Sequence, residues 1–131
     1  MAPEEELYAA ALAARARAYS PHSNFAVGCA IRSASGAIHV GANVENQSYP
    51  EGWCAETSAI AQMIMAGERE ILEVCVVADL DPPITPCGGC RQRLAEFAGP
   101  STLVHAGDLG GPRASWTMAE LLPAVFRLEE G

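Results

Sequence analysis

The sequence predicts an α/β sandwich built around a central mixed sheet. Helix-like and strand-like segments follow one another in the order helix, two strands, helix, strand, helix, strand, and this alternation is typical of α/β domains. Residues 72–80 form a continuous apolar run, as expected for a strand that is covered on both faces in the middle of a sheet. With 131 residues, the chain has the size of one domain, residues 1–131, with a sizeable core.

The first segment is expected to be a helix followed by a pair of strands. Pro3 and the three glutamates after it suit a helix N-terminus, where the macrodipole favours negative charge, and the helix should run to about Ala18. Turn-forming residues then separate the elements that follow. These are a loop at 20–24, a strand at 25–31, a hairpin turn at 33–36 and a strand from about 37 to 44.

The second half places two helices and a short strand around the apolar run. A polar loop at 46–52 leads to a helix that starts at Cys54 and stops near Gly67, and Cys87 opens a third helix after Pro82 and Pro83. The remaining expectations are the end of the third helix at Gly99-Pro100, a short strand at 102–104, a loop at 107–115 and a short helix at 118–122.

Charge and composition exclude several classes of partner. Eight Lys and Arg residues against sixteen Asp and Glu give a net charge of −8, which repels the phosphates of a nucleic-acid polymer and of an anionic membrane. The N-terminus is acidic where a signal peptide needs basic residues, and no apolar run approaches the roughly 20 residues that span a bilayer. We therefore expect a cytoplasmic protein, in which five cysteines point to metal binding, catalysis or burial rather than to disulfides.

Three of the cysteines are arranged as ligands of a catalytic metal. Cys54 and the pair Cys87 and Cys90 each follow a loop and open a helix, and helix N-termini favour thiolates. Catalytic zinc keeps three protein ligands, whereas structural zinc usually has four. Glu56, two residues after Cys54, can then lie beside the metal without binding it and act as a general acid and base.

These motifs resemble those of the zinc-dependent nucleobase deaminases, whose signature joins His/Cys-x-Glu to Pro-Cys-x-x-Cys. More narrowly, the chain is similar to the small homotetrameric cytidine deaminases that act on free nucleosides. The matching segments are Y-S-P-H-S-N-F-A-V-G at 19–28, G-A-N-V-E-N at 41–46, Y-P-E-G-W-C at 49–54, C-A-E at 54–56, P-C-G-G-C-R-Q at 86–92 and L-L-P-A-V-F at 121–126.

The resemblance implies a fold, an activity and a site. The fold would be a three-layer α/β/α sandwich with a mixed five-stranded sheet, and the activity hydrolytic deamination of cytidine and deoxycytidine to uridine and deoxyuridine in pyrimidine salvage. Cys54, Cys87 and Cys90 would hold one Zn²⁺ per subunit, and Glu56 would transfer protons. The substrate would be held by stacking on Phe25, by Asn43 and Glu45 at the ribose, by the backbone of Ala55 and Thr85 at the base, and by Phe126 from a neighbouring subunit of a homotetramer.

Two positions depart from the family pattern. Thr57 stands where the family often has an arginine that offsets the thiolate charge, and His22 replaces a common tyrosine. Arg91 is then expected to be the only adjacent cation, so the site should be electron-rich and its water less acidic. On this reasoning, Thr57→Arg would shift the pH profile of turnover to lower pH.

Other functions stay open at this point. Another aminopyrimidine nucleoside, such as blasticidin S, could be the substrate, and the preference between ribose and deoxyribose is undetermined. A non-catalytic structural zinc module would need a fourth ligand, and a redox Cys-x-x-Cys protein would leave Cys54 and Glu56 unexplained. The remaining cysteines and histidines are expected to have structural roles, namely Cys29, Cys75, His22, His39 and His105.

Overall fold

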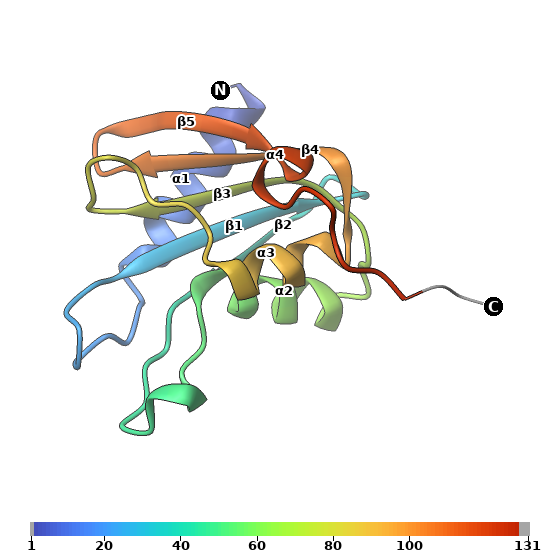
Figure 1. Ribbon diagram of the computed structural model, residues 1–131. Coiled ribbons are helices and arrows are strands. Elements are labelled where there is room, and N and C mark those ends of the chain that lie inside the picture. Colours follow the sequence, from blue (N-terminus) through green and yellow to red (C-terminus); the bar gives the residue numbers. More distant parts are fainter. Residues whose placement is uncertain (1, 129–131) are drawn as a thin grey trace.

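The computed structural model describes residues 2–128, which form a five-stranded sheet with helices on both faces (Figure 1). The elements in chain order are α1 (Pro3–Arg15), β1 (Val27–Ser33), β2 (Ile38–Ala42), the 3₁₀ turn η1 (Tyr49–Glu51), α2 (Ala55–Met65), β3 (Ile71–Ala78), α3 (Gly88–Ala95), β4 (Ala98–Asp108), β5 (Gly111–Thr117) and α4 (Met118–Leu121).

The sheet is mixed, as predicted. Its strand order is β2-β1-β3-β4-β5, with β3 and β4 parallel and the other neighbouring pairs antiparallel. The apolar run predicted to lie in the middle is β3, and its residues 74–78 are all buried. Because β3 and β4 are parallel, the connection between them crosses one face of the sheet, and α3 lies in that connection.

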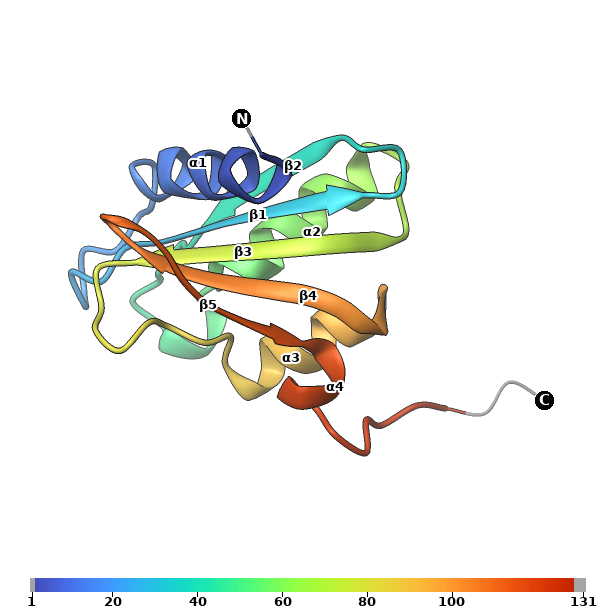
Figure 2. The same cartoon turned by 90° about the horizontal axis from the view of Figure 1, so that it is seen from above.

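Helices cover both faces and make three layers (Figure 2). Leu7 and Ala11 of α1 pack with Cys75 and Val77 of β3 on one face. A larger core on the other face joins α2, α3 and α4 to the sheet, and Met63 and Leu94 are fully buried in it. None of the helices in the described part of the chain has the length and the apolarity needed to cross a bilayer.

Glycine allows the helices to approach the sheet closely at two places. A Cβ atom on Gly28 would lie 2.0 Å from the carbonyl oxygen of Ala11 in α1, and one on Gly41 would lie 2.3 Å from the backbone nitrogen of Ala59 in α2. Real side chains cannot occupy such positions without moving the backbone. The second contact bears on function because α2 begins directly after Cys54.

Three expectations about the elements are wrong. The third helix ends at Ala95 instead of at Gly99-Pro100, and the short strand expected at 102–104 is the longer β4, because Ala98 already pairs with Ile71 of β3. The first helix ends at Arg15 instead of Ala18, because the chain turns away there and the backbone of Tyr19 donates to the carbonyl of Asn43. The segment 107–115, expected to be a loop, contains the end of β4 and most of β5. The glycines and Pro112 suggested a loop, but β5 lies at the edge of the sheet, where proline is tolerated.

Candidate functional site

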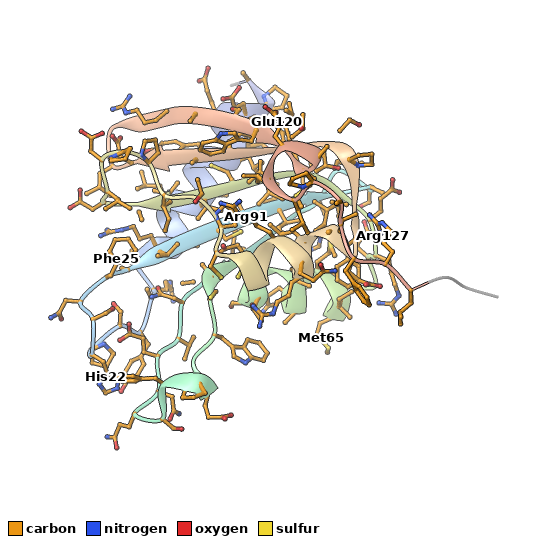
Figure 3. All side chains as sticks on the ribbon, viewed as in Figure 1. His22, Phe25, Met65, Arg91, Glu120 and Arg127 are labelled. Atoms are coloured by element: carbon orange, nitrogen blue, oxygen red, sulfur yellow. The ribbon has the colours of Figure 1, made fainter. Side chains whose placement is uncertain are left out.

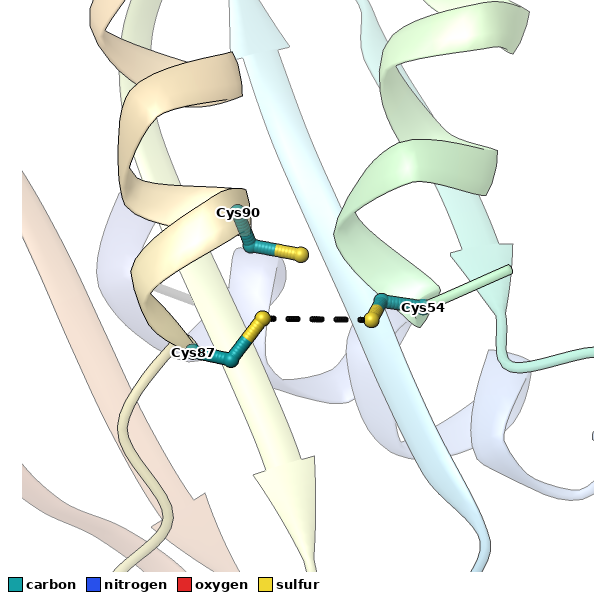
Figure 4. A group of neighbouring side chains, drawn as sticks. All are labelled: Cys54, Cys87 and Cys90. Carbon is teal, nitrogen blue, oxygen red and sulfur yellow. Dashed lines mark hydrogen bonds between the residues drawn. The ribbon is translucent and has the colours of Figure 1, made fainter. Parts of the chain in front are cut away.

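The N-termini of α2 and α3 lie side by side and bring three cysteines together (Figure 4). Cys54 is the N-cap residue of α2, Cys87 is the N-cap residue of α3, and Cys90 lies in the first turn of α3. Their sulfur atoms all lie within 4.8 Å of one another. The unpaired backbone N–H groups of the two helix starts therefore point toward the same place, which stabilises negative charge on sulfur.

Backbone contacts outside the helices fix how Cys54 reaches this place. Val44 and Trp53 form an antiparallel bridge in which each backbone nitrogen donates to the other residue's oxygen, at 2.9 and 2.8 Å. This bridge closes the base of the loop that contains η1. Cys54 follows Trp53 directly, so its position is fixed both by the bridge between Trp53 and Val44 and by the start of α2.

Arg91 fixes the approach to Cys87. Its guanidinium donates to the carbonyl of Pro86 at 2.8 Å, to the hydroxyl of Thr85 at 3.2 Å and to the carbonyl of Leu121 at 2.9 Å. Figure 3 shows Arg91 near the start of α3, between this helix and the sheet. The arginine thus joins the segment before Cys87 to α3 and to α4.

The spacing and the chemistry of the three sulfur atoms fit a zinc ion. Sulfur atoms that bind tetrahedral zinc at about 2.3 Å lie roughly 3.8 Å apart, and the Sγ atoms of Cys54 and Cys87 are 4.0 Å apart. A hydrogen bond to Cys54, together with burial, raises the pKa of the Cys90 thiol well above its usual value. Such closely packed thiols resist losing all their protons on their own, and a divalent cation supplies the charge that makes this possible.

Among residues 2–128, the cluster of potential metal ligands consists of these three cysteines alone. A closed structural zinc site normally has four protein ligands. The arrangement in the described residues is therefore that of an open site, which leaves one position for water or substrate.

Glu56 lies in the first turn of α2 and is 4% exposed. Burial raises the pKa of its carboxyl group, while a hydrogen bond with Cys90 and the positive charge of Arg93 oppose this shift. A carboxyl group with a raised pKa can hold a proton and release it closer to neutral pH than an exposed glutamate can. Its position beside the cysteines makes it a candidate general acid and base.

Asn43 holds the segment that contains Phe25. Its side-chain oxygen accepts from the backbone nitrogen of Val27 at 2.9 Å, and its amide nitrogen donates to the carbonyl of Phe25 at 2.8 Å. Phe25 packs against the larger core and lies directly before β1, at the end of the sheet from which α2 and α3 start (Figure 3). Asn43 therefore has a structural function that the sequence did not indicate.

Glu45, two residues after Asn43, holds the same segment at His22 and Ser23. Its carboxylate accepts from the backbone nitrogens of His22 at 2.8 Å and Ser23 at 3.1 Å, and from the hydroxyl of Ser23. The Ser23 hydroxyl contributes most to lowering the pKa of Glu45. A cavity of about 320 Å³ adjoins these groups and is lined by His22, Ser23, Glu45, Asn46, Tyr49 and Gly52.

The other predicted substrate residues lie in different surroundings. Ala55 is buried at the start of α2 and is 1% exposed. Thr85 is exposed in the segment just before Cys87. Phe126 is 67% exposed, and its carbonyl accepts from Gln92 of α3 at 3.2 Å. Ala55 and Thr85 thus adjoin the cysteines along the chain, whereas the ring of Phe126 extends largely into solvent.

The expectation that Arg91 is the only cation beside the site is wrong. The Nη1 atom of Arg93 donates to the Sγ atom of Cys90 at 3.6 Å, while the nitrogens of Arg91 bond to oxygen atoms. Arg93 follows Cys90 by three residues, and residues at this spacing lie on the same face of a helix. This spacing was the sequence signal that could have identified Arg93.

The cysteines and histidines expected to be structural are buried or hydrogen-bonded and do not belong to the three-cysteine cluster. Cys29 and Cys75 are fully buried, and burial raises the pKa of Cys75 to about 12. The ring of His105 lies 2.6 Å from the Ser115 hydroxyl and 2.5 Å from the Glu73 carboxylate. The His39 ring lies 2.9 Å from the Ser33 hydroxyl, and the His22 backbone bonds to Glu45.

Comparisons with known proteins agree with this geometry. The model of the cytidine and deoxycytidylate deaminase zinc-binding region matches residues 1–106. Cytidine deaminase from Halalkalibacterium halodurans is 42% identical over 92% of this chain and 91% of its own, and that from Sporosarcina psychrophila is 40% identical over 96% and 93%. The crystal structure of cytidine deaminase from Burkholderia pseudomallei superposes with a TM-score of 0.87 at 40% identity, covering 92% of this chain and 97% of its own. The chain belongs to the cytidine and deoxycytidylate deaminase family.

Proposed function

We propose that this protein catalyses the zinc-dependent hydrolysis of cytidine and deoxycytidine to uridine and deoxyuridine, with release of ammonia. The observation that carries the proposal is the convergence of three cysteine sulfurs at two helix N-termini, beside a buried glutamate. Membership of the deaminase family supports the reaction class. Water enters the reaction at C4 of the pyrimidine, and the amino group leaves from the same carbon.

Cys54, Cys87 and Cys90 would hold one zinc ion per subunit. Zinc with three protein ligands and an open position supplies the Lewis acidity that makes water nucleophilic near neutral pH. The two helix N-termini stabilise the three thiolates, and the Arg91 hydrogen bonds hold the segment that carries Cys87. These contacts keep the sulfur atoms in place without a fourth protein ligand.

Glu56 would carry the protons of the reaction. Hydrolysis moves both protons of the attacking water: one reaches the ring N3, and the second leaves the new C4 hydroxyl group and reaches the departing amino nitrogen. A carboxyl group whose pKa is raised by burial can accept the first proton and donate it onward. Since Glu56 is 4% exposed, bulk water does not compete freely for this proton.

The nucleoside would lie at the end of the sheet next to the starts of α2 and α3. Phe25 would stack on the base, whose polar edge would bond to the Ala55 N–H and the Thr85 carbonyl. Asn43 and Glu45 would bond to the ribose, since the Asn43 amide keeps a second N–H and the Glu45 carboxylate keeps unshared lone pairs beyond the contacts described above.

We infer assembly and cellular setting from the same features. Phe126 is largely exposed at the end of the described chain, and it would complete the site of a neighbouring subunit in a homotetramer. Residues 1–131 would form one catalytic domain that works in the cytoplasm in pyrimidine salvage. The net charge of −8 supports a free nucleoside rather than a nucleic-acid polymer as substrate.

Glu56→Gln tests the mechanism. We expect unchanged zinc content, measured by elemental analysis, and a fall in kcat of roughly 10²–10⁴-fold, which is the usual contribution of general acid and base catalysis. Glu70→Gln is the matched control, because Glu70 is exposed at the entry to β3. Zinc loss or full activity in Glu56→Gln would show that the role of Glu56 is misassigned.

A substrate panel separates the candidate reactions. Purified protein is assayed by ultraviolet absorbance with cytidine, deoxycytidine, cytosine, adenosine and blasticidin S. We expect turnover of both cytidine nucleosides and none of cytosine, because the groups placed at the ribose would stay unpaired without a sugar. Turnover of blasticidin S alone would reject the proposed substrate, and a zinc-loaded protein inactive on the whole panel would favour a structural zinc module.

A further inference from the structure

The charge of a zinc site with three thiolates is not balanced by its ligands. Three thiolates and one Zn²⁺ leave one net negative charge, and the buried Glu56 adds to it when ionised. A cation close to the sulfur atoms stabilises such a site. Two arginines, Arg91 and Arg93, come from the helix that carries Cys87 and Cys90.

Their contacts distinguish the two arginines. Arg91 donates to oxygen atoms of Pro86, Thr85 and Leu121. Arg93 donates from Nη1 to the Cys90 sulfur at 3.6 Å. Within residues 2–128, no carboxylate lies at ion-pair distance from Arg93, so no ion pair neutralises its charge beside the sulfur cluster.

The local sequence leaves room for this contact. Gly89 precedes Arg93 by four residues, and the guanidinium lies back over it. A Cβ atom on Gly89 would lie 3.3 Å from the Nη1 atom of Arg93, which is the atom that donates to Cys90. An alanine at position 89 would therefore press on the end of the guanidinium, which would have to move by a few tenths of an ångström.

Thr57 of α2 also lies close to the same sulfur. Its hydroxyl lies 3.9 Å from the Cys90 sulfur, and Thr57 and Arg93 both line a groove of about 330 Å³ between α2 and α3. A long side chain at position 57 would enter the space in which the Arg93 guanidinium now lies. The two positions can thus supply a cation to one sulfur from opposite helices.

We propose that Arg93 is a positioning residue that balances the charge of the metal site through its hydrogen bond to Cys90, and that Gly89 provides the space for it. The inference rests on the proposed zinc function. Zinc binding at neutral pH replaces three thiol protons and makes the cluster more negative, so a neighbouring positive charge favours the zinc-bound form.

Zinc retention is the test. Zinc-loaded wild type and variants are titrated with a chromophoric chelator, and the zinc left per protomer is measured. We expect Arg93→Met to bind zinc about tenfold more weakly than wild type. Removal of a group bonded to a metal ligand typically weakens metal binding about 10- to 100-fold, and the lower end of this range applies because Arg93 is exposed. Arg93→Lys should recover part of this loss. Arg69→Met is the control, since Arg69 is exposed beyond the opposite end of α2.

Two further variants test the geometry. Gly89→Ala keeps the arginine but crowds its Nη1 atom, so zinc retention should fall in the same direction. Adding Thr57→Arg to Arg93→Met should restore retention, because the new guanidinium reaches the same sulfur. Circular dichroism of each metal-free variant verifies folding, and Arg93→Gln, which removes the charge but keeps a polar side chain, is measured in its place if Arg93→Met does not fold.

The results separate this inference from the proposed function. If wild type binds zinc and deaminates cytidine while Arg93→Met and Gly89→Ala retain zinc within twofold of wild type, the role of Arg93 is refuted and the function stands. An equal loss in Arg69→Met, or no recovery by either Arg93→Lys or Thr57→Arg, would also refute charge balance. A wild type that binds no zinc would overturn both proposals.

Discussion

Asn43→Ala should weaken the fold measurably, whatever the substrate. The substitution removes the acceptor for the Val27 nitrogen and the donor for the Phe25 carbonyl. A net hydrogen bond contributes about 1 kcal/mol, so the two together predict a loss of about 2 kcal/mol. With an unfolding entropy of about 2.1 cal/mol/K per residue and 131 residues, this loss corresponds to a fall in Tm of roughly 7 °C.

The assay is urea and thermal unfolding of zinc-loaded protein at one fixed protomer concentration, so that metal binding and assembly contribute equally to every sample. Asn43→Asp is the matched variant, because its carboxylate still accepts from Val27 but cannot donate to Phe25. It should lose at least half as much stability, because the carboxylate oxygen that replaces the amide nitrogen faces the Phe25 carbonyl oxygen. A fall of less than about 0.5 kcal/mol in Asn43→Ala would refute the structural role of this side chain.

Three further predictions concern packing, pH dependence and thiol reactivity. Gly41→Ala should lower the free energy of unfolding in urea by about 3 kcal/mol or more, because its Cβ would lie 2.3 Å from a backbone nitrogen of α2. The displaced helix should also release zinc. Gly88→Ala is the control and should not destabilise the fold, since no atom lies within 4 Å of its Cβ. Ser23→Ala should raise the pKa of Glu45 seen by NMR, since the serine hydroxyl lowers it. Hydrogen bonds to an ionised Glu45 stabilise the fold above the unfolded-state pKa, and this contribution disappears as pH falls through the lower folded-state pKa. An unchanged Glu45 titration would contradict the assignment. Chelation should expose Cys54 and Cys87 to alkylation at pH 8. Cys75, whose pKa burial raises to about 12, and the fully buried Cys90 should stay unmodified; modification of Cys75 in the native state would contradict that burial.

The best-predicted parts of the fold are those with a clear local sequence pattern, such as an apolar run or a polar loop before a helix. The apolar run at 72–80 is β3 in the middle of the sheet, because only a strand covered on both faces needs apolar residues on both. The helices expected to open at Cys54 and Cys87 begin one residue later, with these cysteines as N-caps. A polar loop before each helix made these starts visible, and Gly67 marked the end of α2, whereas Gly99, expected to end the third helix, lies inside β4.

The hairpin of β4 and β5 was not visible in the sequence because its stability comes from pairing. Val104 pairs with Trp116, and His105 pairs with Ser115. The two strands are connected through Leu109 and Gly110, and Gly111 has a positive φ of 150°. Glycine and proline have a high propensity for loops, so local sequence predicts a loop here. The segment is extended because it pairs with β4.

The cysteine cluster was predictable from spacing, but the direction of the nearby arginines was not. Arg91 and Arg93 are both within three residues of Cys90, and sequence proximity favoured Arg91. Which of them meets a sulfur depends on competing acceptors, and three oxygen atoms around the loop before Cys87 engage Arg91. Only the folded arrangement leaves Arg93 to contact Cys90.

Asn43 and Glu45, the residues proposed to bind the ribose, also hold a loop of the fold. Both side chains reach across to residues 22–27, where Asn43 fixes the backbone around Phe25 and Glu45 fixes the backbone at His22 and Ser23. A ligand that used the remaining hydrogen-bonding capacity of these two groups would meet a loop already held in place, so little conformational entropy would be lost on binding. On the proposed binding mode, ribose recognition and loop order would be coupled, and a substitution that loosens the loop should raise KM even when the substituted side chain never touches the nucleoside.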